Sequence, residues 1–127
     1  MKLSDLPSLE REAIDLLLEG EDATMQALRG QLASVVGVER TETGAGVYVI
    51  FTLVADVERA PNAMTFHIAD VVGVSSTCND EVEFILFVKE GLIEYLEAYT
   101  YSDSYPSYLE SKFELTRAAA SVGPKKN

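Results

Sequence analysis

Length, composition and charge restrict the kind of protein that this chain can form. Its 127 residues suffice for one compact domain and are too few for two ordinary ones, and its apolar fraction of 47% is typical of a globular protein. With 21 acidic and 10 basic residues the net charge is −11, which repels nucleic acid phosphates and anionic membrane surfaces. We therefore expect no nucleic acid or membrane partner. A basic protein partner, a cation, or a charge that only keeps the protein soluble are all compatible with this composition.

Cysteine content and the N-terminal segment bear on the compartment. The single cysteine, Cys78, cannot form an internal disulfide, so the cysteine count does not require an oxidising compartment. The N-terminal stretch MKLSDLPSLE has acids and a proline where a signal peptide has an apolar core. No uninterrupted apolar run is longer than that of residues 47–51, far short of the ~20 residues that span a bilayer as a helix. We expect a cytoplasmic protein.

Helical periodicity dominates the N-terminal part of the chain. Apolar residues recur there every three or four positions: Leu9, Ala13, Leu16 and Leu17, then Met25, Leu28, Leu32 and Val35. Pro7 suits a first helical turn and Gly20 a C-terminal stop, so we predict one helix over residues 6–19 and a second that begins after Asp22. Because the connection is short, the two helices are expected to form an antiparallel hairpin.

Beyond the helices, the pattern changes to that of β-strands. β-Branched and aromatic residues concentrate between turn signals, which predicts strands over residues 35–42, 46–55, 64–73, 81–88 and 92–101. Residues 112–116 are predicted to add a short edge strand. The connections are short and leave no room for helical crossovers between the last strands, so the sheet is expected to be an antiparallel meander.

The predicted fold is therefore α+β. We expect an N-terminal antiparallel helical hairpin packed on one face of a five- or six-stranded antiparallel sheet. We assign residues 1–117 to a single domain and residues 118–127 to a flexible C-terminal tail, because the tail has little to bury.

Residues 87–101, FVKEGLIEYLEAYTY, predict a β-hairpin that turns at Lys89-Glu90-Gly91. A two-residue type I′ turn would need positive φ at Glu90, which glutamate resists, whereas a three-residue turn needs it at Gly91 alone. We favour the three-residue turn. The register that follows pairs Val88 with Leu92, Leu86 with Glu94, Phe84 with Leu96 and Val82 with Ala98 on one face, and Phe87 with Ile93, Ile85 with Tyr95, Glu83 with Glu97 and Glu81 with Tyr99 on the other.

The first of these faces is almost wholly apolar and is expected to pack under the helices, with Glu94 as its exception. The second face sets two carboxylates, Glu83 and Glu97, directly opposite one another among aromatic rings. Opposed like charges are unfavourable, so this pair needs an explanation. Three remain open: both carboxylates point into solvent, they belong to a ligand-binding or partner-binding patch, or they form a catalytic or metal-binding pair.

The residues that usually carry catalysis or bind metals are scarce. The sequence has one histidine, His67, and one cysteine, so a zinc site would have to use carboxylate ligands, which is uncommon. No acidic loop has the spacing of a calcium site. No serine lies in a G-x-S-x-G elbow, and Cys78 has no adjacent base. We expect no metal, no cofactor and no catalytic residue, which favours a protein that is not an enzyme.

Tyrosines gather in the last third of the chain, at Tyr95, Tyr99, Tyr101, Tyr105 and Tyr108. Tyrosine offers a broad contact area and a polar tip, which suits an interface, although these rings could equally cap the edges of the core. The candidate binding residues are Glu83, Glu97, Tyr95, Tyr99, Tyr101 and His67.

Several motifs follow one another along the chain: LRGQL (28–32), TGAGVY (43–48), IADV (68–71), FILFVKEG (84–91), LEAYTY (96–101) and YP (105–106). In this order they resemble a widespread group of small uncharacterised bacterial proteins, over about residues 5–116. That group often has Trp-Pro at 105–106 and Gly at Ala98. The resemblance implies a bacterial, cytoplasmic, single-domain protein and singles out Glu97, Tyr99 and Tyr101, but it implies no activity.

Three hypotheses about function follow. The first is a non-enzymatic interaction protein whose acidic, tyrosine-bearing sheet face meets a protein partner, for example as an immunity-type inhibitor of a basic toxin. The second is a small-molecule binding protein or enzyme with a pocket at the Glu83, Glu97 and Tyr99 face, lined also by Tyr95 and His67. The third is a homodimer that pairs exposed sheet faces or edges.

Overall fold

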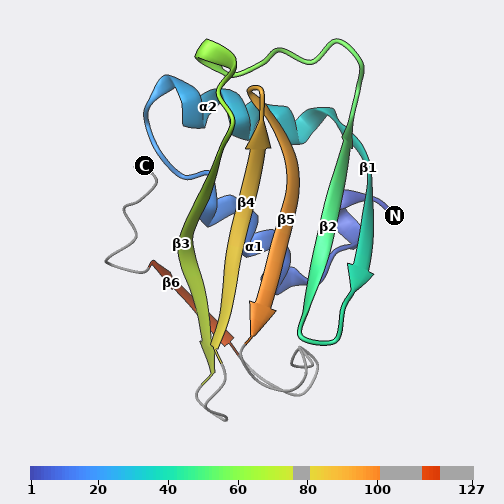
Figure 1. Cartoon of the computed structure of the whole chain (residues 1–127), viewed down its shortest axis with the longest axis vertical. Helices are drawn as coiled ribbons and strands as arrows, with labels where there is room; N and C mark the ends of the chain where they lie inside the picture. Colours follow the sequence, from blue (N-terminus) through green and yellow to red (C-terminus); the bar gives the residue numbers. More distant parts are fainter. Residues whose placement is uncertain (76–80, 101–112, 118–127) are drawn as a thin grey trace.

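Two short α-helices precede one antiparallel sheet in the structure, a computed structural model that describes residues 1–75, 81–100 and 113–117 (Figure 1). The helices are α1 (Ser8–Leu17) and α2 (Ala23–Gly30), and 3₁₀ turns occur at η1 (Leu3–Asp5), η2 (Gln31–Ser34) and η3 (Pro61–Ala63). The strands are β1 (Val35–Glu42), β2 (Gly46–Leu53), β3 (Phe66–Ser75), β4 (Glu81–Lys89), β5 (Leu92–Thr100) and β6 (Phe113–Arg117). Their bounds lie within two residues of the predicted ones, and the α+β class with an antiparallel sheet is confirmed.

The strand order corrects the predicted meander. The order is β1-β2-β5-β4-β3-β6, so β2 pairs with β5 instead of β3. Three strand spacings of about 4.8 Å separate β2 from β3. Residues 54–65 cover that distance across one end of the sheet (Figure 1). The predicted meander instead requires these residues to form a local loop between neighbouring strands.

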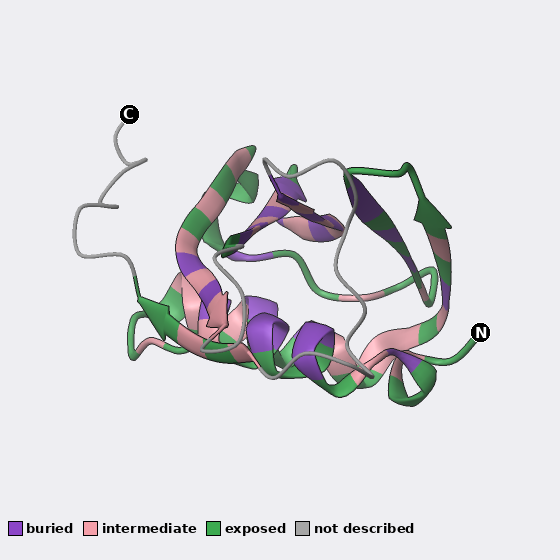
Figure 2. Cartoon of the chain, turned by 90° about the horizontal axis from the view of Figure 1, so that it is seen from below, coloured by how far each residue is buried: buried purple, intermediate pink, exposed green. Residues whose placement is uncertain are grey.

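Helix α1 packs against β3, β4 and β6 on one side of the sheet. Seen along the strands in Figure 2, the sheet curves around α1 and the buried residues gather between them. Asp22 caps α2 by accepting a hydrogen bond from the amide of Met25 at 3.4 Å, as its sequence position predicts. Helix α2 ends at Gly30, five residues before the last position of its apolar repeat at Val35, and lies across one end of the sheet (Figure 1). Antiparallel packing of the two helices is not confirmed and stays a prediction.

The core lies between α1 and the inner face of the sheet. Its strand residues come from alternate positions of the central strands, as side chains of a half-buried sheet must: Val47, Val49, Phe51, Val82, Phe84, Leu86, Val88, Leu96 and Ala98. The predicted inner face of the β4 and β5 hairpin is therefore confirmed for these residues. Glu94 leaves this face at a β-bulge. The two residues before it exchange their predicted faces: Ile93 is buried and pairs with Val88, whereas Leu92 is half-buried and pairs with Lys89.

The turn between β4 and β5 corrects our turn prediction. Glu90 and Gly91 both have positive φ, 52° and 79°, as a two-residue type I′ turn requires. Glu90 accepts this conformation because residues 59–65 hold its backbone: its amide donates to Oγ1 of Thr65 at 2.9 Å, and its carbonyl accepts from Nη1 of Arg59 at 2.7 Å. The three-residue turn was wrong because it was judged on local preference alone.

The side chain of Gln31, in η2, binds backbone groups of the same turn. It is 2% exposed, and its Nε2 donates to the carbonyls of Gly91 at 2.8 Å and Glu58 at 3.0 Å. Its Oε1 accepts from the amide of Ile93 at 2.9 Å. A single buried amide therefore joins η2, the 54–65 crossing and the end of the hairpin.

Candidate functional site

We name the side of the sheet opposite α1 the outer face. It is formed by the strand positions that alternate with the core: Tyr48 and Ile50 of β2, Tyr95, Glu97 and Tyr99 of β5, Glu83, Ile85 and Phe87 of β4, and His67 of β3. All of these side chains are half-buried or exposed. The face therefore contains five of the six candidate residues, while Tyr101 lies outside the described residues.

An aromatic row crosses the outer face over four adjacent strands. The rings of Tyr48 and Tyr95 meet edge to face at 5.8 Å, and Tyr95 stacks on Phe87 at 4.4 Å with an interplanar angle of 18°. Phe87 continues to the ring of His67 at 5.8 Å. Such pairs contribute about 1 kcal/mol each beyond the area that they bury, so the row adds side-chain contacts between the four strands.

Sequence reasoning placed His67 and Tyr95 in the candidate site and missed Tyr48 and Phe87. Tyr48 was missed because its place depends on the pairing of β2 with β5, which the predicted meander did not contain. Phe87 was assigned to the correct face but to the wrong partner. The signal that was present is the alternation in Val47-Tyr48-Val49-Ile50, where two β-branched residues point inward and two large apolar residues point outward.

The expected opposition of Glu83 and Glu97 is wrong. Glu83 pairs with Tyr99, and Glu97 pairs with Ile85. The two-residue turn moves the register by one position, and the bulge at Glu94 moves it by one more. The total shift of two keeps every residue from 95 to 99 on its predicted face but changes its partner.

Each carboxylate has a tyrosine for a neighbour instead. The hydroxyl of Tyr99 donates to Oε1 of Glu83 at 2.9 Å. Glu97 lies opposite Tyr48 across the β2 and β5 pair, and its negative charge is the main cause of a raised pKa of the Tyr48 phenol. Burial first, and then the charges of Glu97 and Glu94, raise the pKa of Tyr95. Both phenols therefore stay protonated at neutral pH and can donate hydrogen bonds.

The arginines of the described strands point away from the outer face. Arg40 of β1 and Arg117 of β6 turn toward α1, where Arg40 binds Glu10 and Arg117 binds Glu19 and the carbonyl of Leu16. The outer face keeps its acids, among them Glu39 opposite Ile50. Within the described strands its charge is thus acidic, with Lys89 beside the hairpin turn.

Glu10, on the helix side of the sheet, is a further residue that sequence reasoning missed. It is fully buried, and the Arg40 guanidinium binds it through Nε and Nη2, with contacts from 2.6 to 3.2 Å. The signal was its position, because Glu10 precedes Ala13, Ile14 and Leu17 in the same helical stripe and must face the core with them. The pair fixes α1 to the sheet edge.

Residues 1–75, 81–100 and 113–117 contain no group of three His, Cys, Asp or Glu side chains placed to hold a metal ion. Over the same residues, neither helix has the length and apolar character needed to cross a bilayer. Cys78, Tyr105 and Tyr108 lie outside the described residues, as does the predicted tail.

Comparison with known proteins finds no match for the chain among family models, curated proteins or solved structures.

Proposed function

We propose that the protein is a non-enzymatic interaction protein that binds a basic protein partner through its outer face. The observation that carries the proposal is the aromatic row from Tyr48 to His67, set in an acidic strand surface. Tyr48 and Ile50 remain 36% and 42% exposed at one end of that row. Large exposed apolar groups next to tyrosines are the composition of an interface core.

The chemistry of the outer face favours a cationic partner. Aromatic faces attract the guanidinium and ammonium groups of Arg and Lys, and nearby carboxylates such as Glu39 and Glu97 add charge-assisted hydrogen bonds. The net charge of −11 would accelerate the encounter by electrostatic steering. An immunity-type inhibitor of a basic toxin in a bacterial cytoplasm has this chemistry.

The small-molecule alternative has less support from this geometry. A pocket built on Glu83 and Glu97 requires the two carboxylates to converge, whereas one accepts a hydrogen bond from Tyr99 and the other lies opposite Ile85. The homodimer alternative uses the same outer face with a second copy as the partner. It predicts that light scattering would measure the mass of a dimer, whereas the main proposal does not require one.

The test is affinity capture from native lysate at low salt with three forms of the chain. The face variant carries Tyr48→Thr and Ile50→Thr, which retain β propensity and remove the exposed apolar surface. The matched control carries Val54→Thr and Met64→Thr, whose side chains are 39% and 56% exposed outside the described strands.

We expect the wild type and the control to retain one basic protein that the face variant loses, and moderate salt to release it. Equal retention by both variants, or retention that salt does not affect, would contradict the proposal. Light scattering on the same three forms identifies the homodimer: a dimeric wild type and a monomeric face variant would make a second copy the partner.

A further inference from the structure

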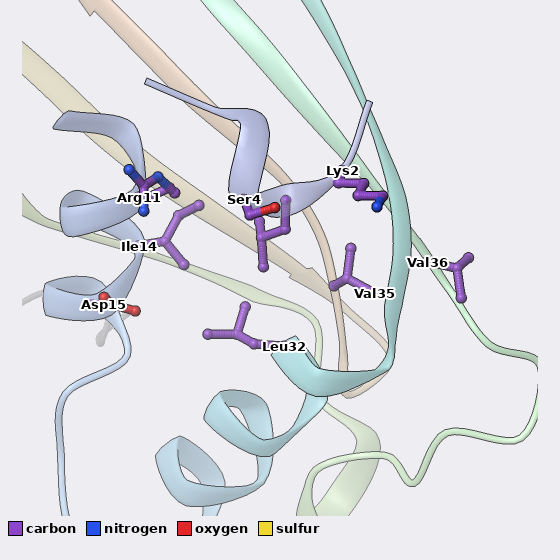
Figure 3. Close-up of a pocket in the computed structure, with 9 residues that line it drawn as sticks. Lys2, Ser4, Arg11, Ile14, Asp15, Leu32, Val35 and Val36 are labelled. Carbon is purple, nitrogen blue, oxygen red and sulfur yellow. The ribbon is translucent and has the colours of Figure 1, made fainter. Parts of the chain in front are cut away.

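A hollow of about 560 Å³ opens on the helix side of the molecule, between the N-terminal segment, α1, η2 and the start of β1 (Figure 3). This volume falls in the range of roughly 300 to 1,000 Å³ that small-molecule sites occupy. The hollow shares no residue with the outer face, so what it binds is independent of the function proposed above.

Apolar side chains from four elements line the hollow. Ile14 of α1 is buried, and Leu3 of η1, Leu32 of η2 and Val35 of β1 are half-buried against the core. In Figure 3, Ile14, Leu32 and Val35 extend toward the same space. Leu3, Leu32 and Val35, which are half-buried, leave apolar surface that a ligand would cover.

Two positively charged side chains lie at the rim of the hollow. Arg11 on α1 and Lys2 on the N-terminal segment both line the hollow (Figure 3). Within the described part of the chain, the Lys2 ammonium makes no hydrogen bond or ion pair, and Arg11 uses only Nε, which donates to the carbonyl of Leu6 at 3.1 Å. The terminal nitrogens of Arg11 remain available to a ligand.

The balance of charge at the rim selects the class of ligand. The lining contains two cations, Lys2 and Arg11, and one acid, Asp15, so the hollow carries a net positive charge in a chain whose net charge is −11. Arginine binds a carboxylate through paired N–H donors, and the Ser4 hydroxyl at the same rim adds a donor. We propose that this hollow binds a small organic acid with an apolar body, its carboxylate on Arg11 and its body on Leu3, Ile14, Leu32 and Val35.

Octanoate is the probe, titrated into the full chain and followed by NMR of side-chain methyl groups. Arg11→Gln is the variant that removes the carboxylate partner. Arg59→Gln is its matched control, because Arg59 is also an exposed arginine that donates to a backbone carbonyl, that of Glu90, but lies beside the hairpin turn. Octylammonium, with the same apolar body and the opposite charge, is the ligand control.

We expect saturable octanoate shifts at the methyl groups of Ile14, Leu32 and Val35. Arg11→Gln should raise the dissociation constant about tenfold, the usual effect of one hydrogen bond to a charged group, while Arg59→Gln leaves it unchanged. Octylammonium should bind more weakly than octanoate. Equal binding of the two probes, an unchanged constant in Arg11→Gln, or shifts confined to other parts of the molecule would each overturn the proposal.

Discussion

Arg40 of β1 binds Glu10 of α1 through two nitrogens of its guanidinium, with Nη2 at 2.6 Å from Oε2. The carboxylate is fully buried, and the arginine side chain is 15% exposed. The hydrogen bonds to Glu10 raise the pKa of Arg40 beyond its already high ordinary value, so the guanidinium stays charged at every pH in which the protein is handled. It ties the first helix to β1, which is an edge strand among the strands that the structure describes.

Removing the arginine should therefore cost much more than removing an arginine from a surface pair. Arg40→Met leaves the Glu10 charge buried without its main partner, and we expect the free energy of unfolding in urea to fall by about 3 kcal/mol. The comparison change Arg59→Met removes an exposed contact with the Glu90 carboxylate at 4.0 Å and a hydrogen bond to the Glu90 carbonyl, and should cost about 1 kcal/mol. A loss of equal size in both variants would contradict the structural role of the buried pair.

Gln31 offers a second test, because one side chain holds three backbone groups. Gln31→Leu conserves volume but leaves the amide of Ile93 without its acceptor, and we expect a loss of about 2 kcal/mol in the free energy of unfolding. Gln26→Leu is the control, since that glutamine is exposed and donates only to the carbonyl of Glu21. If urea denaturation gives the two variants the same midpoint, Gln31 does not fasten the hairpin.

Sequence periodicity was enough to place the strands and to assign most of their faces. Leu92 and Ile93 exchange faces because the two-residue turn moves the start of β5 by one position. The period of two separates Phe84 and Leu86 from Ile85 and Phe87 whatever the register, because side chains alternate along any strand. For the same reason Tyr95 and Glu97 were assigned to the outer face correctly even though their predicted partners were wrong.

The partners could not be predicted because they depend on contacts distant in sequence. Thr65 and Arg59 bind the backbone of Glu90 in its positive-φ conformation, and a local preference for turn residues takes neither of them into account. The pairing of Tyr48 with Glu97 depends on the pairing of β2 with β5, which no local sequence pattern predicts. Five residues of the outer face were thus predicted from the sequence, whereas the place of Tyr48 and the partners of the two carboxylates depend on the fold.

Gly91 should tolerate no side chain. Its φ of +79° strains any other residue, and a β-carbon there would lie 3.0 Å from the amide nitrogen of Ala60 and from Cα of Ala63. We expect Gly91→Ala to lower the free energy of unfolding by about 2 kcal/mol. Gly30→Ala is the control: Gly30 has helical dihedral angles and open space around it, so alanine should be neutral or slightly stabilising. A thermal melt of both variants that shows no difference would reject the tight contact between the turn and residues 60–63.

The raised pKa of Tyr48 depends on the charge of Glu97 and can be tested directly. Glu97→Gln removes that charge, so the pKa of Tyr48, followed by NMR of its ring carbon, should fall toward the ordinary tyrosine value of about 10. Glu114→Gln, an exposed change on β6, should leave it in place.

The sign of the linked stability follows from the direction of the shift. Because the folded pKa of Tyr48 lies above the unfolded one, its contribution is complete below the unfolded pKa and is lost as pH rises through the folded value. The free energy of unfolding should therefore fall less steeply with rising alkaline pH in Glu97→Gln than in the wild type. Near neutral pH, Tyr48 is protonated in both forms and adds no pH dependence. A Tyr48 titration that is identical in wild type and Glu97→Gln would show that the two side chains do not interact across β2 and β5, and would remove Glu97 from the acidic surface around the aromatic row.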